Sequence, residues 1–106
     1  MTFMVLLEFS MTPLAKGDSV SAYVARCLRI IEESGLDYRL HAMGTIVEGE
    51  IHEVLEVLKR CFDELAADCD RISCTAKLDY RKGYRGRLES KVTSVEEKVG
   101  KKLKKA

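Results

Sequence analysis

Long apolar runs, net charge and closely spaced cysteines are all scarce in this sequence. The longest apolar run extends only from Phe3 to Leu7, whereas a membrane-spanning helix needs about 20 apolar residues. The chain also shows no basic-then-apolar leader, so we expect a cytoplasmic protein that does not bind membranes. Eighteen basic and seventeen acidic residues give a net charge of +1, a balance that does not predict a nucleic-acid-binding protein.

The four cysteines form no CxxC motif, and the sequence has only two histidines, His41 and His52. Structural zinc sites use paired ligands at short spacing, so we predict no metal site. We expect the cysteines to be reduced and mostly buried, where they behave as small apolar residues. A Cys69–Cys74 disulfide is the alternative, but it would suit only an unusual cytosol. The cysteines are Cys27, Cys61, Cys69 and Cys74.

The length and apolar content predict one folded domain that covers residues 1–106. A chain of 106 residues can bury roughly 60–70% of its unfolded surface, which suffices for a single two-layer core. Apolar residues make up 46% of the sequence, so we do not expect extensive disorder.

Residues 3–11 alternate between two sets of side chains, which is typical of a β-strand. One set is wholly apolar and is predicted to face the core. The other set begins apolar and becomes polar, which is unusual for a face that is simply exposed to water. The first set is Phe3, Val5, Leu7, Phe9 and Met11. The second set is Met4, Leu6, Glu8 and Ser10.

A helix is predicted after the loop 12–17, with Asp18 or Ser19 as its N-cap and Gly35 just past its end. Its apolar residues recur at helical spacing, namely Val20, Val24, Cys27, Leu28 and Ile31. Two strands are predicted next, over 38–43 and 45–48, with a tight turn between them.

A second helix is predicted after Glu50, and a fourth strand over residues 71–80, which alternate again. Residues 81–91 are polar and contain glycine, which is typical of a loop. A capping-box sequence at 93–96 predicts a short C-terminal helix that reaches Leu103 and ends in a solvated basic tail. The predicted apolar stripe of the second helix is Ile51, Val54, Leu55, Leu58, Phe62 and Leu65.

This order predicts an α+β fold, the ferredoxin-like βαββαβ sandwich, in which a four-stranded antiparallel sheet carries two helices on one face. The other face would be free of helices and would expose Met4 and Leu6 on a central strand. An exposed apolar sheet face predicts a contact surface. We therefore expect a homodimer or homotetramer that assembles through the helix-free sheet face.

Four segments resemble the thiamine-binding protein family related to YkoF, whose small single-domain members were long catalogued as uncharacterised. In chain order they are VLLEFSMTPL, SVSAYVARCLRIIEESGLDYRLHAMGTIVEGE, RISCTAKLDYR and KVTSVEEKVG. The resemblance implies a ferredoxin-like fold, assembly as dimers or tetramers, and no established enzymatic activity. It also implies a small-molecule ligand, thiamine or its hydroxymethylpyrimidine precursor. We predict no cofactor and no catalytic residue.

For such a ligand, five residues are candidates for the binding site: Glu8, Ser10, Ser21, Thr45 and Glu48. An aminopyrimidine has a ring nitrogen beside an exocyclic amine, and a carboxylate accepts hydrogen bonds from both when the ring is protonated. Glu8 and Glu48 are the candidate carboxylates, and their charge also favours the cationic thiazolium ring. Ser10, Ser21 and Thr45 offer hydroxyl groups that donate or accept hydrogen bonds.

Two other functions stay open. The first is a structural or regulatory oligomer whose sheet face serves assembly alone and that binds no small molecule. The second is an enzyme acting on a cofactor fragment, although the sequence has no recognisable Ser–His–Asp or Cys–His spacing, and neither histidine has an evident acidic partner. The stretch AMGTIVEGE, residues 42–50, also has a structural interpretation: Gly44 forms a turn, and Glu50 favours a helix start.

Overall fold

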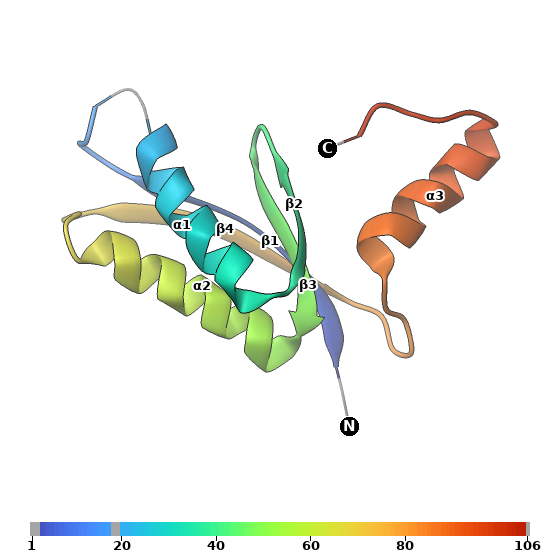
Figure 1. Ribbon diagram of the computed structural model, residues 1–106, viewed down its shortest axis with the longest axis horizontal. Coiled ribbons are helices and arrows are strands. Elements are labelled where there is room, and N and C mark those ends of the chain that lie inside the picture. Colours follow the sequence, from blue (N-terminus) through green and yellow to red (C-terminus); the bar gives the residue numbers. More distant parts are fainter. Residues whose placement is uncertain (1–2, 18–19, 106) are drawn as a thin grey trace.

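Residues 3–17 and 20–105, which the computed structural model describes, form four strands and three helices (Figure 1). Their order confirms the predicted ferredoxin-like α+β fold, with a third helix after the last strand. The elements are β1 (Met4–Pro13), α1 (Ser21–Ser34), β2 (Asp37–His41), β3 (Gly44–Glu50), α2 (Ile51–Ala66), β4 (Ile72–Tyr80) and α3 (Arg87–Val99).

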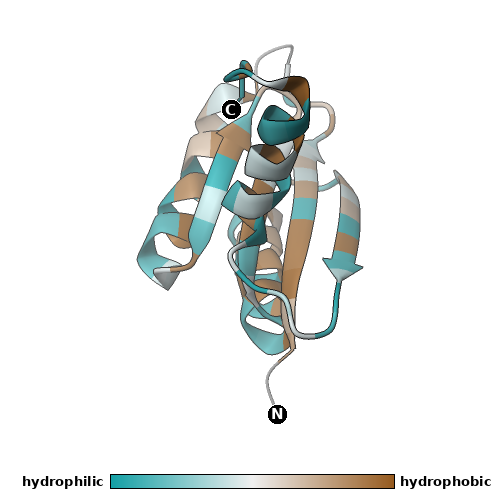
Figure 2. Cartoon of the chain, turned by 90° about the vertical axis from the view of Figure 1, so that its right-hand side faces the viewer, coloured by the Kyte–Doolittle hydropathy of each residue, from teal (hydrophilic) through white to brown (hydrophobic). Residues whose placement is uncertain are grey.

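The four strands form one antiparallel sheet in the spatial order β2-β3-β1-β4. The central strand β1 alternates as predicted, because every second side chain is buried against the helices. Hydrophobic and hydrophilic bands follow one another along the strands in Figure 2. The buried side chains of β1 that belong to the core are Val5, Leu7, Phe9 and Met11.

Helices α1 and α2 cover one face of the sheet, and the apolar stripe predicted for α2 is partly wrong. The stripe is rotated, so that Val57 and Cys61 are buried while Leu55 and Phe62 are 43% and 49% exposed. The buried residues of α2 are Val54, Val57, Cys61 and Leu65, which follow spacings of three and four. Those of α1 are Cys27, Ile30 and Ile31.

The C-terminal end of α1 and the start of α2 follow familiar local rules, whereas the start of α1 does not. Gly35 adopts a left-handed conformation just past α1, as predicted, and its N–H donates to the carbonyl of Glu32. Val20 occupies the N-cap position of α1 without a side-chain hydrogen bond, and the predicted caps Asp18 and Ser19 lie outside the described residues. At the start of α2, Glu50 and Glu53 form a capping box.

Arg26 ties α1 to α2 on the outer side of the helical layer. Its guanidinium donates to the Glu64 carboxylate at 3.1 Å, to the Glu64 carbonyl at 2.7 Å and to both Asp68 carboxylate oxygens at 3.0 Å. The hydrogen bonds from Arg26 lower the pKa of the Asp68 carboxyl. The two helices are therefore joined by charge as well as by apolar packing.

Helix α3 starts earlier than predicted and lies on the opposite face of the sheet from α1 and α2 (Figure 1). It begins at Arg87 after a left-handed Gly86, so Thr93 is in the middle of the helix rather than at a cap. The loop predicted over 81–91 therefore ends at Gly86. The Arg87 backbone N–H donates to the Glu48 carboxylate at 2.9 Å, and its guanidinium pairs with Asp79.

The expectation of a helix-free sheet face is consequently wrong for the part formed by β2 and β3. Leu6 on β1 pairs in register with Glu48 on one side and Asp79 on the other. These two carboxylates hold the first residue of α3 over the sheet. What stays free of helices on this face is the part toward β4.

The remaining strands differ from prediction mainly at their ends. β2 ends at His41 rather than Met43, and β3 extends to Glu50. The cysteines are free, as expected: Cys27, Cys61 and Cys69 are buried, and Cys74 is exposed. Among the described residues, no helix has the length and apolar character needed to cross a membrane.

Candidate ligand-binding site

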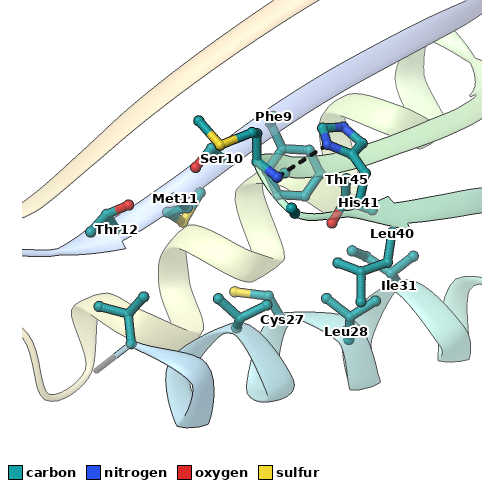
Figure 3. Close-up of a pocket in the computed structure, with 15 residues that line it drawn as sticks. Phe9, Ser10, Met11, Thr12, Cys27, Leu28, Ile31, Leu40, His41 and Thr45 are labelled. Carbon is teal, nitrogen blue, oxygen red and sulfur yellow. Dashed lines mark hydrogen bonds between the residues drawn. The ribbon is translucent and has the colours of Figure 1, made fainter. Parts of the chain in front are cut away.

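A hollow of about 240 Å³ lies between the C-terminal part of β1, helix α1 and the β2–β3 turn. In Figure 3, α1 forms one wall with Cys27, Leu28 and Ile31, and β1 forms the facing wall. We call this the ring hollow. Its lining residues are mostly apolar, and three of them, Ser10, Thr12 and Thr45, carry hydroxyl groups. The Thr45 side chain lies on the same side of the sheet as Phe9, whereas those of Ser10 and Thr12 start from the other face of β1. Such a composition suits a small, flat and partly polar molecule.

The backbone of β1 also faces the ring hollow. β1 pairs with β4 as far as Pro13, but its pairing with β3 ends where Phe9 meets Thr45. Successive strand residues direct their N–H and C=O groups to alternate sides, so part of the backbone of 10–12 faces the hollow instead of a strand. Backbone groups of this kind need hydrogen-bonding partners, which a polar ligand can provide.

Gly44 allows the β2–β3 turn to approach β1 closely. A Cβ atom at this position would lie 2.8 Å from the backbone oxygen of Phe9 and 3.6 Å from Cε1 of His41. The first distance is too short for a real Cβ atom, whereas the second is an ordinary contact. The turn that the sequence predicts at Gly44 thus has a second role, which is to bring His41 toward β1.

His41 links the turn to Glu8. Its Nδ1 accepts a hydrogen bond from the Met43 N–H at 3.2 Å, so in the neutral ring Nε2 carries the proton (Figure 3). Nε2 lies 3.3 Å from the Glu8 carboxylate, within ion-pair distance. Their geometry is not that of a hydrogen bond, and this buried Nε2 has no hydrogen-bond partner among the described residues. The pair leaves a donor and an acceptor side by side.

A neighbouring hollow of about 310 Å³ contains Glu8, and we call it the Glu8 hollow. It shares Phe9, Ser10, His41 and Met43 with the ring hollow. Lys77 on β4, which pairs in register with Glu8, lines its other side. The two hollows together combine an apolar recess with an adjacent carboxylate.

The structure brings three of the five predicted residues together. Ser10 lines both hollows, Thr45 lines the ring hollow, and Glu8 lines the Glu8 hollow. Ser21 is exposed in the first turn of α1, and neither it nor Glu48 belongs to the linings of these two hollows. Glu48 is 6% exposed and accepts the Arg87 N–H beneath α3.

Sequence reasoning missed His41, because its partner Glu8 is 33 residues away in the chain. No acidic partner is evident for either histidine from the sequence, whereas in the structure His41 lies near Glu8 and Nε2 of His52 lies 3.5 Å from the carboxylate of its chain neighbour Glu50. A signal did exist: the turn predicted at Gly44 places His41 close to the β2–β3 connection. The contact of His41 with Glu8 follows only from the register of β3 against β1, which local sequence does not give.

Cys27 contributes a thiol to the wall of the ring hollow. Cys61 donates to the Cys27 backbone carbonyl with an S···O distance of 3.7 Å, and a thiol hydrogen bond from Cys61 lowers the pKa of Cys27. That interaction, together with burial, raises the pKa of Cys61 well above its usual range. The two thiols therefore differ in acidity although they lie in the same helical interface.

Fold and hollows define a ferredoxin-like α+β domain with a candidate small-molecule site at one end of its sheet. The chain belongs to the thiamine-binding protein family, because the family model described as thiamine-binding protein matches residues 7–96. This result confirms the family resemblance of the sequence.

Relatives in bacteria and archaea share most of the chain. A UPF0045 protein of Mycobacterium bovis is 38% identical over 93 residues, covering 87% of this chain and 91% of its own. A UPF0045 protein of Methanocaldococcus jannaschii is 35% identical over 93 residues, covering 88% and 93%. The names of these relatives give no function.

Solved structures support the same fold. A crystal structure of a Methanocaldococcus jannaschii protein superposes with a TM-score of 0.82 at 34% identity, covering 89% of this chain and 97% of that one. A Thermotoga maritima protein, provisionally assigned to thiamine biosynthesis or salvage, superposes with a TM-score of 0.76. It is 23% identical and covers 87% of this chain and 98% of its own, so it bears on the fold alone.

Proposed function

We propose that this chain is a non-catalytic binding protein for thiamine or its hydroxymethylpyrimidine precursor. The pyrimidine would occupy the ring hollow, and the cationic thiazolium of thiamine would lie against Glu8. One observation carries this proposal: an apolar recess with hydroxyl groups adjoins a carboxylate, in a chain of the thiamine-binding family.

The volumes support a ligand that extends over both hollows. Sites for drug-sized ligands usually measure about 300–1,000 Å³, so the ring hollow, at about 240 Å³, suits one ring with small substituents. A second ring must then lie outside it. The Glu8 hollow, at about 310 Å³, provides that space and shares four lining residues with the first.

The available groups match the chemistry of an aminopyrimidine. Its amine donates and its ring nitrogens accept, and hydroxyls at Ser10 and Thr45 can serve either role. Phe9 and Met43 offer an aromatic ring and a thioether for packing against a flat heterocycle. A thiazolium would give Glu8 a permanent cation in place of the His41 imidazole, whose geometry toward Glu8 is poor.

A binding role, rather than catalysis, is supported by the family description and by the character of the walls. The ring hollow is lined mainly by aliphatic, aromatic and hydroxyl side chains, which hold a ligand without supplying an acid–base pair. Glu8 and His41 are the nearest such pair, and in this proposal Glu8 provides charge complementarity.

We also propose that copies of the chain associate through exposed apolar surface on the sheet. The part of the helix-free face toward β4 is one candidate. Exposed Leu78 and Tyr80, on the other side of β4, support a second candidate surface. The apolar character of Leu78 and Tyr80 favours a second copy of the chain as the partner at this surface over a charged molecule.

Two variants separate the proposed roles of the hollows. Calorimetric titration should show that Thr45→Val weakens binding of both hydroxymethylpyrimidine and thiamine, because both place the pyrimidine in the ring hollow. Glu8→Gln should weaken thiamine binding about tenfold and leave hydroxymethylpyrimidine nearly unchanged, since only thiamine carries the thiazolium charge. Glu56→Gln, on the exposed side of α2, is the matched control.

Thermal unfolding of the unmodified chain provides the second measurement. A ligand specific for the folded state adds about 2.7 kcal/mol at a hundredfold excess over its dissociation constant. If neither compound raises the melting temperature, the proposed ligands are wrong. Equal weakening of both compounds by Glu8→Gln would instead contradict the placement of the thiazolium at Glu8.

A further inference from the structure

A separate hollow of about 380 Å³ lies between α3 and the sheet surface formed by β2 and β3. α3 is buried against the sheet at its first turn, through Arg87 and Leu88. Beyond this turn the helix stands away from the strands, as Figure 1 shows. We call this space the α3 hollow; its volume is within the range of small-ligand sites. His41 borders it as well as the ring hollow, but its other lining residues are different.

A buried carboxylate folds the C-terminal tail back toward this hollow. Glu96 on α3 is 5% exposed, and it accepts hydrogen bonds from the Leu103 N–H at 2.6 Å and from Lys105 Nζ at 2.8 Å. These contacts lower the pKa of the Glu96 carboxyl, Lys105 having the largest effect. The tail is therefore held against α3 through Leu103 and Lys105, while its lysines stay exposed to solvent as expected. Lys102 and Lys105 line the hollow.

Donors converge on the hollow from two elements. Arg39 on β2 uses only Nη1 in its hydrogen bonds, to Asp37 and to the Tyr38 carbonyl. Its Nε and Nη2 make no hydrogen bond within the described part of the chain, so a planar pair of donors stays available. Lys102 comes from the tail and has no ion pair within 4.0 Å among residues 3–17 and 20–105.

Charge and shape restrict the ligand. Three cationic side chains line the hollow, and the carboxylates of Glu89 and Glu96 offset two of them, which leaves one net positive charge. Asp37 pairs with Arg39 from outside the hollow, and its side chain is 59% exposed. Ile46, Leu88 and Val92 supply an apolar surface. One oxyanion on a compact apolar body fits this combination.

We propose that the α3 hollow binds a small organic acid through Arg39 and Lys102. The ligand carries one terminal carboxylate or phosphoryl group, which faces these two cations. Its apolar body packs on Ile46 and Val92, between the sheet and α3. Apart from His41, which borders both hollows, this site uses residues other than those proposed for thiamine, and it does not depend on that function.

Amide chemical shifts of the isotope-labelled full chain test the site. Benzoate and phenyl phosphate serve as probes, with benzyl alcohol as the neutral analogue. We expect millimolar amounts of at least one acid to shift the amides of Ile46, Val92 and Lys102, and benzyl alcohol to shift them much less. Binding should weaken about tenfold in Arg39→Gln and in Lys102→Gln, because each loses a charge-assisted hydrogen bond. Lys98→Gln, on exposed α3 surface outside the hollow, should bind normally.

The probes also identify the anion. A response to phenyl phosphate alone would assign a phosphoryl group, and a response to benzoate would assign a carboxylate. The proposal fails if neither acid shifts these amides, if benzyl alcohol is as effective, or if both variants keep full affinity. Thiamine titrated in parallel should act on the amides around Ser10 and Thr45, so either site can fail without the other.

Discussion

Gly44 determines how closely the β2–β3 turn approaches β1. The nearest atom to a Cβ added there is the Phe9 backbone oxygen, which belongs to the central strand and cannot move without disturbing the sheet. The His41 ring lies beside Gly44 at ordinary contact distance, and its Nε2 lies 3.3 Å from the Glu8 carboxylate. One missing Cβ atom thus sets the position of the turn that lines the ring hollow.

Gly44→Ala should destabilise the protein by about 1–3 kcal/mol, the usual cost of forcing extra atoms into a packed region. The turn must move away from Phe9, and we expect the His41–Glu8 approach to loosen with it. Urea unfolding measures the stability, and titration with hydroxymethylpyrimidine measures the site.

Gly83→Ala is the control for the backbone contribution. Gly83 has a φ of 81°, yet a Cβ at this position meets nothing within 4 Å. Its substitution should cost only the left-handed conformation, about 1 kcal/mol. Equal losses of stability for the two variants would show that the contact with Phe9 is unimportant.

Glu48 illustrates what single residues in a sequence do not reveal. A carboxylate in a short central strand predicted a ligand contact, and that role stays a prediction. The structure supplies another partner, the backbone N–H of Arg87, which is 39 residues away in the chain. A carboxylate at the first turn of a helix is favoured by the unpaired N–H groups there. No local pattern indicates that α3 begins at this point above the sheet.

At the scale of single elements, α2 shows how a stripe can be predicted with the wrong rotation. The sequence offers Leu55 and Phe62 as large apolar residues, but smaller ones are buried in their place. Val57 is 3% exposed and Cys61 is fully buried, because α1 approaches this side of α2. Helical spacing identifies the helix correctly, whereas the buried side depends on the neighbouring helix.

Truncations on the two sides of α2 should therefore have unequal effects. Val57→Ala leaves a cavity in the core and should cost about 2 kcal/mol, although it removes only two methyl groups. Phe62→Ala removes a whole ring from a half-exposed position and should cost less than about 1 kcal/mol. Denaturant unfolding of both variants gives the comparison. A larger loss for Phe62→Ala would mean that this ring is buried in solution, for example against a second copy.

The start of α3 was mispredicted for a similar reason. A capping-box sequence at 93–96 is a real local signal, but Glu96 instead holds the tail through Leu103 and Lys105. The helix begins six residues before Thr93, where Glu48 and Asp79 bind Arg87. Contacts with the sheet decide this boundary, so local sequence is insufficient to locate it.

For the whole molecule, the strand and helix order was predictable because alternation and helical spacing are clear in the first 80 residues. The element order then restricts the topology to the ferredoxin-like arrangement. The placement of α3 was not predictable, since it depends on two carboxylates from different strands. The distribution of exposed apolar surface was missed as well, because it depends on how far α1 and α2 extend over the sheet.

The exposed apolar side chains of β4 are relevant to self-association. Leu78 pairs in register with buried Leu7 and faces the same side of the sheet, yet it is 47% exposed. Tyr80 on the same face is 46% exposed, and its ring packs edge-on against Phe3 at 5.8 Å between centroids. β4 is also an edge strand, so its outer backbone groups are open to pairing.

Leu78→Asp should lower the mass in solution, measured by light scattering, because a carboxylate would be buried in the proposed contact. Ser73→Asp adds the same charge to the opposite, helix-free face of β4 and is the matched control. Dissociation by Leu78→Asp alone would assign the contact to the apolar side of β4. Dissociation by Ser73→Asp alone would assign it to the helix-free face. If the unmodified chain is a monomer at micromolar concentration, the proposal of self-association is wrong on either face.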